Sequence, residues 1–151
     1  MRVADLLKPD SVIADLRVAD KGRALRELAR RAAPLVDLPE STILAALAAR
    51  EKLGSTGVGA GVAVPHARIA GLRGLHGLFA RLARPIAFDA IDGGPVDLIF
   101  LLLVPESASS EHLAALACVS RALRNPATAK LLRGTTAAPA LHAILTEKSD
   151  D

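Results

Sequence analysis

Residue types that together can carry phosphoryl chemistry gather around one glycine-rich stretch of this sequence. We predict a short strand that ends at His66, and Arg50 lies near the expected end of the preceding helix. A neutral imidazole is a nucleophile at cellular pH, and a guanidinium presents a planar fork to phosphoryl oxygens. Four glycines within residues 54–61 provide backbone N–H groups that can form an anion-binding nest. This combination is that of a candidate phosphohistidine site.

Five residues of the glycine-rich stretch are candidates for binding the phosphate: Ser55, Thr56, Gly57, Gly59 and Gly61. A purely structural loop is the alternative for them. Two nucleotide-binding motifs do not fit. A P-loop has Lys followed by Ser or Thr after its glycines, whereas Val62 and Ala63 follow here. A dinucleotide fingerprint has a preceding strand and wider glycine spacing, whereas the preceding segment is expected to be helical.

A second histidine, His112, falls in the first turn of an expected helix that Ser109 or Ser110 would cap. The positive end of the helix dipole disfavours an imidazolium there, so His112 would stay neutral and donate a hydrogen bond to phosphate. An ordinary surface histidine is the alternative. No third ligand stands near His66 and His112 at a spacing that a zinc site requires, so we expect no metal and no cofactor.

The remaining residues with reactive groups receive structural interpretations. His76 and His142 match no motif, and we expect both to be solvated. The single cysteine, Cys118, excludes a disulfide within the chain and is expected on the buried side of a helix. We interpret three aspartates as turn or strand-edge residues without a catalytic role: Asp89, Asp92 and Asp97.

The first half of the chain must place His66 and Arg50. A short strand is predicted at residues 12–14, followed by a helix that Asp20 caps and Pro34 ends. Apolar residues at helical spacing predict the buried face of that helix: Leu25, Leu28, Ala29 and Ala32. A second helix should begin near Pro39 and run to Arg50 or Leu53, where the glycine-rich loop starts.

The second half should supply most of the sheet. We predict strands at residues 78–82 and 85–88, and a strand buried on both faces over residues 96–104. Three helices should follow this strand. The second of them is capped by Asn125, and the third runs through Leu141 and Leu145. The first should turn four residues toward the core: Leu113, Leu116, Ala117 and Leu123. The expected fold is therefore a single α/β domain over residues 1–151, with amphipathic helices on both sides of a central mixed β-sheet.

Composition narrows the classes of partner. Hydrophobic residues make up 51% of the 151 residues, aromatic residues only 2%, and the net charge is +3. The basic residues are scattered and few aromatic side chains are available to stack on bases, so we expect no nucleic-acid partner. The longest apolar run, residues 98–104, is too short for a membrane helix, and charges interrupt the N-terminus. A cytoplasmic location without membrane insertion is expected.

The stretch from Arg50 to His66 resembles the active-site signature of the mannitol/fructose-type IIA proteins of the bacterial phosphotransferase system. The signature ends on a phosphorylated histidine, after an arginine–glutamate pair and a Gly-Ser-Thr-Gly sequence that are also found here. The opening residues 6–10 and the segments 88–98, 104–106 and 111–113 are similar to the family as well. The opening sequence resembles the nitrogen-regulatory branch. One departure is Ala60, where the family usually has asparagine.

This resemblance implies roles for the named residues. His66 would accept the phosphoryl group from an HPr-like phosphohistidine protein, and Arg50 and His112 would stabilise its charge. The protein would be a phosphotransferase component, a phosphocarrier rather than a free-standing turnover enzyme, that regulates target proteins as a monomer or weak homodimer. Apolar residues near Val58, Val62 and Leu113 would receive the partner. The alternatives are a sugar-specific IIA subunit that passes phosphate to a separate IIB protein, a non-phosphorylated binding module with the same fold, and a small nucleotide-binding protein.

Overall fold

One mixed β-sheet organises the computed structural model, which describes residues 1–108 and 110–147. Within these residues the sheet has six strands in the order β1-β5-β6-β3-β2, and β4 also pairs with β6. The antiparallel pair β5 and β6 forms its centre, and β1, β3 and β4 join it in parallel. The strands are β1 (Val12–Leu16), β2 (Gly57–Gly59), β3 (Val62–Ala63), β4 (His66–Ile69), β5 (His76–Ile86) and β6 (Val96–Pro105).

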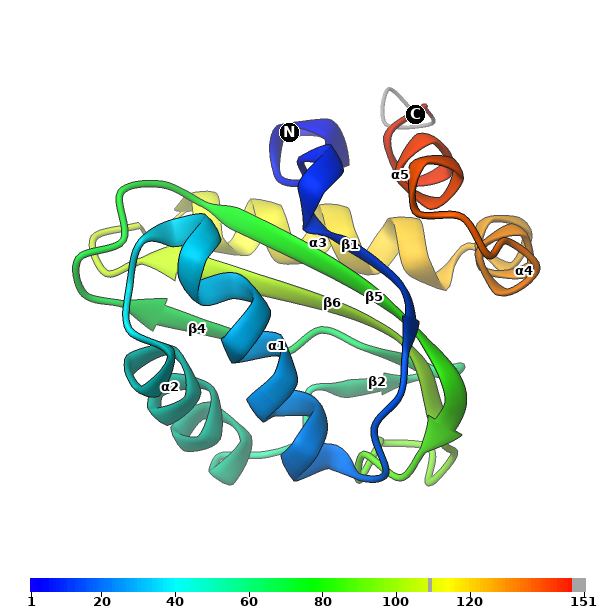
Figure 1. Cartoon of the computed structure of the whole chain (residues 1–151), viewed down its shortest axis with the longest axis horizontal. Coiled ribbons are helices and arrows are strands. Elements are labelled where there is room, and N and C mark those ends of the chain that lie inside the picture. Colours follow the sequence, from blue (N-terminus) through cyan, green and yellow to red (C-terminus); the bar gives the residue numbers. More distant parts are fainter. Residues whose placement is uncertain (109, 148–151) are drawn as a thin grey trace.

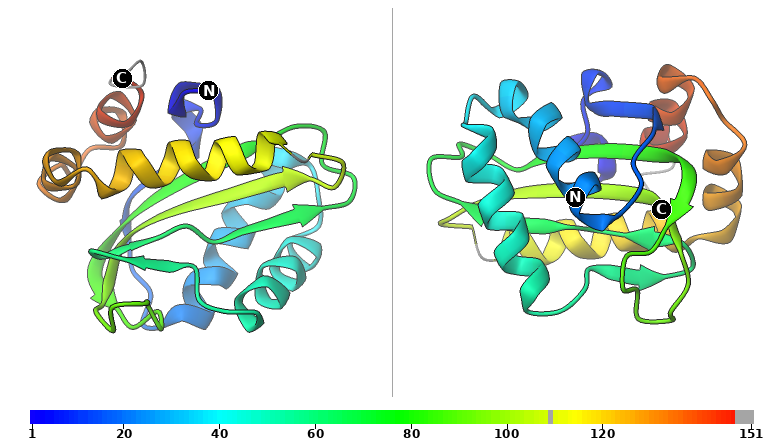
Figure 2. Two further views of the ribbon diagram at one scale, coloured as in Figure 1. Left: turned by 180° about the vertical axis from the view of Figure 1, so that it is seen from behind. Right: turned by 60° about the horizontal axis from the view of Figure 1, so that its bottom comes forward.

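Helices cover both faces of this sheet (Figures 1 and 2). In the described part of the chain, the α-helices are α1 (Lys21–Val36), α2 (Glu40–Lys52), α3 (Ser110–Arg124), α4 (Pro126–Arg133) and α5 (Ala138–Glu147). Two short 3₁₀ turns, Val3–Asp5 and Pro9–Ser11, precede β1. The predicted α/β fold with a mixed sheet between helices is confirmed. In the same described residues, no helix is both long and apolar enough to cross a membrane.

The central strand β6 divides the interior into two cores. Ile99, Leu101 and Leu103 pack with the helices α1 and α2, whereas Leu98, Phe100, Leu102 and Val104 pack with α3, α4 and α5. All seven side chains have no exposed surface. Alternate residues of a strand point to opposite faces, so a continuous apolar run is what a strand between two helical layers requires. The predicted two-sided burial of residues 96–104 is therefore confirmed, except for the partly exposed Asp97.

The helix α1 begins as the sequence predicts and ends later. The side chain of Asp20 accepts a hydrogen bond from the backbone N–H of Arg23, and the apolar stripe faces the core. The prediction that Pro34 ends the helix is wrong, because α1 continues to Val36. Proline lacks one N–H, but its fixed φ is helical, so the last turn can continue through it. The helix ends where Asp37 adopts the left-handed conformation with φ of 55°.

The strands around the candidate histidine differ from the prediction. Residues 57–63 form a tight β2–β3 hairpin rather than an open loop, and β5 is one strand of 11 residues where two were expected. The prediction that His66 ends a strand is also wrong: His66 begins β4. Pro65 has no N–H to donate and interrupts the strand, while its carbonyl accepts a hydrogen bond from Leu102.

The inward face of α3 also differs from the prediction. Ala115, Val119 and Leu123 are buried against the sheet, whereas Leu113 is 71% exposed and Ala117 is exposed. Ala115, Val119 and Leu123 recur at a spacing of four residues, so they form one stripe of the helix, and this stripe faces the sheet. The predicted cap at Ser109 lies outside the described residues. The predicted cap of α4 at Asn125 is confirmed, and so is the last helix through Leu141 and Leu145, which is α5.

Candidate active site

The fold brings His66, Arg50 and His112 together at one end of the sheet. His66 pairs with Leu102 of β6, so its side chain lies on the sheet face that α3 covers. The first turn of α3 carries His112, and the His66 and His112 ring centroids are 5.4 Å apart with an interplanar angle of 66°. The helix α2 packs against β4 from the other side and brings Arg50 to His66. These residues come from three separate elements.

Two hydrogen bonds define the tautomer of His66. Nδ1 lies 2.8 Å from the carbonyl oxygen of Val64, which can only accept, so Nδ1 carries the proton. Nε2 accepts a hydrogen bond from Nε of Arg50 at 3.3 Å and therefore has its lone pair free of a proton. The second nitrogen of Arg50, Nη1, donates to the carbonyl oxygen of Gly54 at 2.8 Å and fixes the guanidinium. The neutral His66 thus presents Nε2 as the nucleophilic atom.

The surroundings also favour the neutral form of His66. Burial lowers the pKa of His66 below its ordinary value of 6.5, and the positive charge of Arg50 lowers it further. The hydrogen bond to Val64 and the charge of Glu51 oppose this shift. Burial is the largest contribution, so the net change is downward. An imidazole that is unprotonated at neutral pH is the form that can attack phosphorus.

His112 supplies an unused polar atom beside His66. Within the described residues, Nε2 of His112 is buried and has no hydrogen-bond partner. Burial lowers the pKa of His112, and the neighbouring His66, Arg68 and Arg50 contribute in the same direction. A buried polar atom without a partner costs free energy, about 1 to 3 kcal/mol, unless a ligand or water satisfies it. A phosphoryl oxygen bound at Nε2 of His66 would be such a partner.

Ser55 and Thr56 lie on the segment that joins α2 to β2, and Gly57 begins β2; the polar groups of all three are engaged within the protein. The hydroxyl of Ser55 donates to the carbonyl oxygen of Phe88 at 2.6 Å and accepts from the N–H of Gly57 at 3.0 Å. Thr56 is buried, and both its N–H and its hydroxyl donate to the carboxylate of Glu51. These contacts shape the wall of the site.

Gly59 and Gly61 lie at the far end of the β2–β3 hairpin. Val62 pairs with Leu98, whereas His66 pairs with Leu102 on the same strand. Four residues of a strand span roughly 13 Å, so the structure does not bring this turn to His66. A side chain at Gly61, which has φ of 79°, would collide with Arg133 and Asp97. These glycines therefore serve the turn of the hairpin.

Comparison with known proteins agrees with this geometry. A family model described as "Phosphoenolpyruvate-dependent sugar phosphotransferase system, EIIA 2" matches residues 5–148. The chain belongs to this family. The EIIA 2 match contains all the candidate residues discussed above.

Three relatives are similar to the chain over nearly their whole length. The "Nitrogen regulatory protein" of Bradyrhizobium diazoefficiens is 48% identical over 145 residues, which is 96% of this chain and 95% of the relative. The crystal structure of "Nitrogen Regulatory Protein IIA-Ntr" from Neisseria meningitidis superposes with a TM-score of 0.90 at 39% identity, covering 95% of this chain and 99% of that one. The IIA mannitol structure from Escherichia coli has a TM-score of 0.79 at 18% identity over 92% and 98% of the chains, a likeness of fold.

Two further residues, Glu51 and Arg68, contribute to the candidate site of this EIIA 2 chain, although the sequence analysis gave them no role. The side chain of Glu51 is only 7% exposed and binds both Lys21, at 2.9 Å, and Thr56. Its position directly after Arg50 in the signature was the available signal. Arg68 donates to the carbonyl oxygens of Glu106 and Ala108 and so holds the loop that leads to α3 and His112. No pattern in the sequence indicates this long-range contact.

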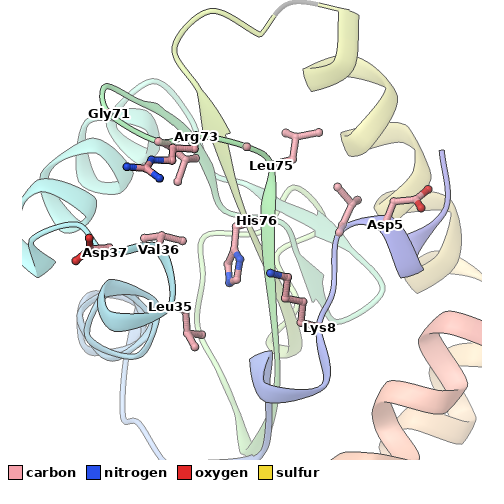
Figure 3. Close-up of a pocket in the computed structure, with 12 residues that line it drawn as sticks. Asp5, Lys8, Leu35, Val36, Asp37, Gly71, Arg73, Leu75 and His76 are labelled. Carbon is pink, nitrogen blue, oxygen red and sulfur yellow. The ribbon is translucent and has the colours of Figure 1, made fainter.

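Of the other two histidines, His76 is buried rather than solvated as predicted, and His142 is only partly exposed. His76 is 8% exposed, and its Nε2 lies 3.3 Å from the buried hydroxyl of Ser11. It lines a cavity of about 420 Å³, in which its ring points between Leu35 and Lys8 (Figure 3). His76 pairs with Leu103, so this cavity lies on the opposite sheet face from His66. Nε2 of His142 lies 3.0 Å from the carbonyl oxygen of Leu7. Both histidines hold the N-terminal segment.

Large exposed apolar side chains flank the site, but they differ from the predicted set. Val62 is fully buried in the α3 core, and Val58 packs partly against the same core. Leu113, next to His112, is 71% exposed, as a residue that receives a partner must be. Leu53, which follows α2 three residues after Arg50, is 84% exposed. Among the described residues, the large exposed apolar side chains that neighbour site residues along the chain are therefore Leu53 and Leu113.

Proposed function

We propose that this chain is a cytoplasmic phosphocarrier of the phosphotransferase system that accepts a phosphoryl group on Nε2 of His66. The observation that carries the proposal is the pair of hydrogen bonds on His66, with Nδ1–H donated to Val64 and Nε2 facing Arg50. The donor would be the phosphohistidine of an HPr-like protein, the general carrier expected upstream of a IIA component. The donor supplies an activated phosphoryl group, so the proposed reaction uses neither a nucleotide nor a cofactor.

In the proposed reaction, the lone pair of Nε2 on His66 attacks phosphorus as the N–P bond of the donor breaks. The bonding electrons return to the donor imidazole, which leaves as a neutral ring if its other nitrogen carried a proton. His66 keeps its Nδ1 proton, so its phosphorylated ring is cationic, and the carbonyl oxygen of Val64 stabilises that charge. No proton needs to be transferred between the two proteins.

Arg50 and His112 would stabilise the phosphoryl group during this in-line transfer. Charge spreads over the equatorial oxygens in the transition state, and fixed donors aimed at them lower the barrier. The guanidinium of Arg50 already lies beside the attacking nitrogen, and the carbonyl oxygen of Gly54 holds it there. Its hydrogen bond occupies the lone pair of Nε2, so the Nε–H of Arg50 must turn to a phosphoryl oxygen as Nε2 attacks phosphorus. For His112 to donate from its buried Nε2, that nitrogen carries the proton of the neutral ring. Both groups are in position before the phosphoryl group arrives.

We further propose that the output is regulatory, as the names of the relatives suggest. Phosphorylation adds a charge of about −1.5 to −2 at neutral pH. That charge would appear beside the exposed Leu53 and Leu113, on the surface where the donor would dock. Target proteins that bind this surface would therefore distinguish the two forms of His66. A sugar-specific IIA role would instead require transfer to a IIB protein.

The proposal can be tested by incubating the chain with phosphoenolpyruvate, enzyme I and an HPr-like protein, and then measuring the intact mass. We expect a gain of one acid-labile phosphoryl group, its loss in His66→Ala, and its retention in His142→Ala. If carriers of both the nitrogen and the sugar branches transfer no phosphate to the folded wild type, the phosphocarrier proposal is wrong. Transfer onward to a IIB protein would replace the regulatory output with the sugar-specific one.

A further inference from the structure

Glu51 is a carboxylate in an unfavourable position. It lies in the last turn of α2, where the helix dipole disfavours negative charge, and its side chain is 7% exposed. Nζ of Lys21, 2.9 Å from Oε1, neutralises it, and the same ammonium lies 4.8 Å from the ring centre of Phe88. Burial of an ion pair contributes little net stability compared with an apolar pair. The hydrogen bonds that Glu51 accepts give a more specific account of its role.

Both oxygens of Glu51 bind one residue of the site wall. Oε1 accepts from the backbone N–H of Thr56 at 3.1 Å, and Oε2 accepts from the hydroxyl of the same residue. Charge-assisted hydrogen bonds of this kind are stronger than neutral ones. They fix the position of the Thr56 peptide relative to α2, the helix that also carries Arg50.

Thr56 in turn fixes the acceptor of the nucleophilic histidine. The carbonyl oxygen of Thr56 accepts from the N–H of Val64 at 3.0 Å, and the carbonyl oxygen of Val64 accepts from Nδ1–H of His66 at 2.8 Å. An unbroken path of hydrogen bonds therefore runs from Glu51 to the imidazole. Which nitrogen of a histidine is protonated is decided by the partner of the other nitrogen.

We propose that Glu51 is a positioning residue that, through Thr56 and Val64, keeps the proton of His66 on Nδ1 and leaves Nε2 free to accept the phosphoryl group. The effect on transfer rests on the function proposed above. The effect on the tautomer does not, because the tautomer exists in the unphosphorylated protein. The negative charge of Glu51 could instead act on His66 directly. That effect would raise the pKa of His66 without selecting a tautomer, because a negative charge favours the imidazolium over both neutral tautomers.

The test measures the tautomer of His66 by long-range ¹H–¹⁵N NMR of the imidazole rings, above the pH at which the ring is protonated. The wild type should show a protonated Nδ1 and an unprotonated Nε2. In Glu51→Gln, the two ring nitrogens should shift toward each other as the second tautomer becomes populated. Glu27→Gln is the matched control, because Glu27 binds Arg30 and Arg31 on the surface of α1 and has no contact with this path.

A second variant guards against a general loss of structure. Thr56→Val keeps the backbone and nearly the shape but removes the hydroxyl bond to Glu51, and Thr42→Val on the exposed side of α2 is its control. We expect a smaller tautomer change in Thr56→Val than in Glu51→Gln. Phosphoryl acceptance should be slower by about 10-fold to 100-fold in Glu51→Gln, the loss that follows when the groups that orient a metal-bound imidazole are removed.

The outcomes separate the two proposals. A wild-type tautomer in both Glu51→Gln and Thr56→Val would overturn the positioning role, even if the rate of transfer fell. A change in the pKa of His66 without a change of tautomer would favour the direct charge effect and would also overturn it. A tautomer change in a protein that accepts no phosphate would support the role of Glu51 and reject the phosphocarrier function instead.

Discussion

Nε of Arg50 donates a hydrogen bond to Nε2 of His66 across 3.3 Å, so the guanidinium contacts the atom that would attack phosphorus. The contact joins the end of α2 to the first residue of β4. It is compatible only with an unprotonated Nε2, and the Nδ1 bond to Val64 independently requires the same tautomer. The charge that must stabilise a phosphoryl group and the nucleophile that must receive it are therefore held as one unit.

Replacing Arg50 by lysine should slow phosphoryl acceptance by about 10-fold to 100-fold, because lysine keeps the charge but loses the fixed fork of donors. The stability of the fold should change little. The rate of phosphate incorporation under single-turnover conditions measures the effect. Arg30→Lys is the control, since Arg30 pairs with Glu27 on the surface of α1. Equal rates for the Arg50 and Arg30 variants would contradict the role of the fork.

Stability should decrease as the pH falls from neutral to mildly acidic values. Burial lowers the pKa of His66, His76 and His112 below 6.5, so the unfolded chain binds protons before the folded one does. The contribution of these histidines to the free energy of unfolding is therefore complete above pH 6.5. It is lost as the pH falls from 6.5 through the lower pKa values of the folded protein. Urea unfolding at a series of pH values measures this loss.

His76→Gln should reduce the loss of stability with falling pH, because glutamine can still bind Ser11 but does not titrate. Carboxylates act in another pH range: Arg30 and Arg31 lower the pKa of Glu27 from 4.5 to about 2, so its contribution to stability is lost as the pH falls from 4.5 to about 2. A stability that stays constant between neutral pH and the carboxylate range would contradict the histidine explanation.

Replacing Ala60 by asparagine should raise the stability by about 0.5 to 1 kcal/mol, because Ala60 adopts a left-handed conformation with φ of 57° that asparagine accepts more readily. The rate of phosphoryl acceptance should not change, since this turn lies at the other end of the hairpin from His66. Urea unfolding measures the change in stability, and the phosphoryl-transfer assay measures the rate. Ala60→Val is the opposing control and should destabilise the fold. A faster transfer in Ala60→Asn would show that the turn does reach the active site.

Leu113→Asp should raise the KM for the phosphorylated donor by about tenfold and leave kcat nearly unchanged. An exposed leucine at the centre of a transient interface contributes of the order of 1 to 2 kcal/mol to binding. Leu131→Asp is the matched control, because Leu131 is exposed on α4, away from the histidines. If both variants changed the KM equally, the surface around Leu53 and Leu113 would not be the docking site.

The sequence correctly predicted the parts of the fold that depend on interactions between residues close together in the chain. The cap at Asp20, the stripe of α1 and the two-sided burial of β6 follow from neighbouring residues and from the spacing of apolar side chains. The errors arise where a distant partner decides. The inward face of α3 carries Ala115 and Val119, which pack in a core built from distant strands, and His76 lies beside the buried Ser11 of the N-terminal segment.

The candidate site shows the same division. The signature and the resemblance identified His66, Arg50 and His112, and the structure places them together. The sequence could not show that Pro65 makes His66 the first residue of β4, or that the turn at Gly59 and Gly61 lies away from it. The path from Glu51 through Thr56 to Val64 depends on backbone carbonyl groups, whose partners no residue type reveals. The tautomer of His66 therefore became visible only in three dimensions.

The most direct test of the central claim is to identify the phosphorylated atom. The protein would be phosphorylated through enzyme I and an HPr-like donor, and ³¹P and ¹⁵N NMR would then assign the phosphoryl group to a ring nitrogen. The account predicts phosphate on Nε2 of His66, with the proton retained on Nδ1 toward Val64. Phosphate on Nδ1 of His66, or on another residue such as His112, would contradict it.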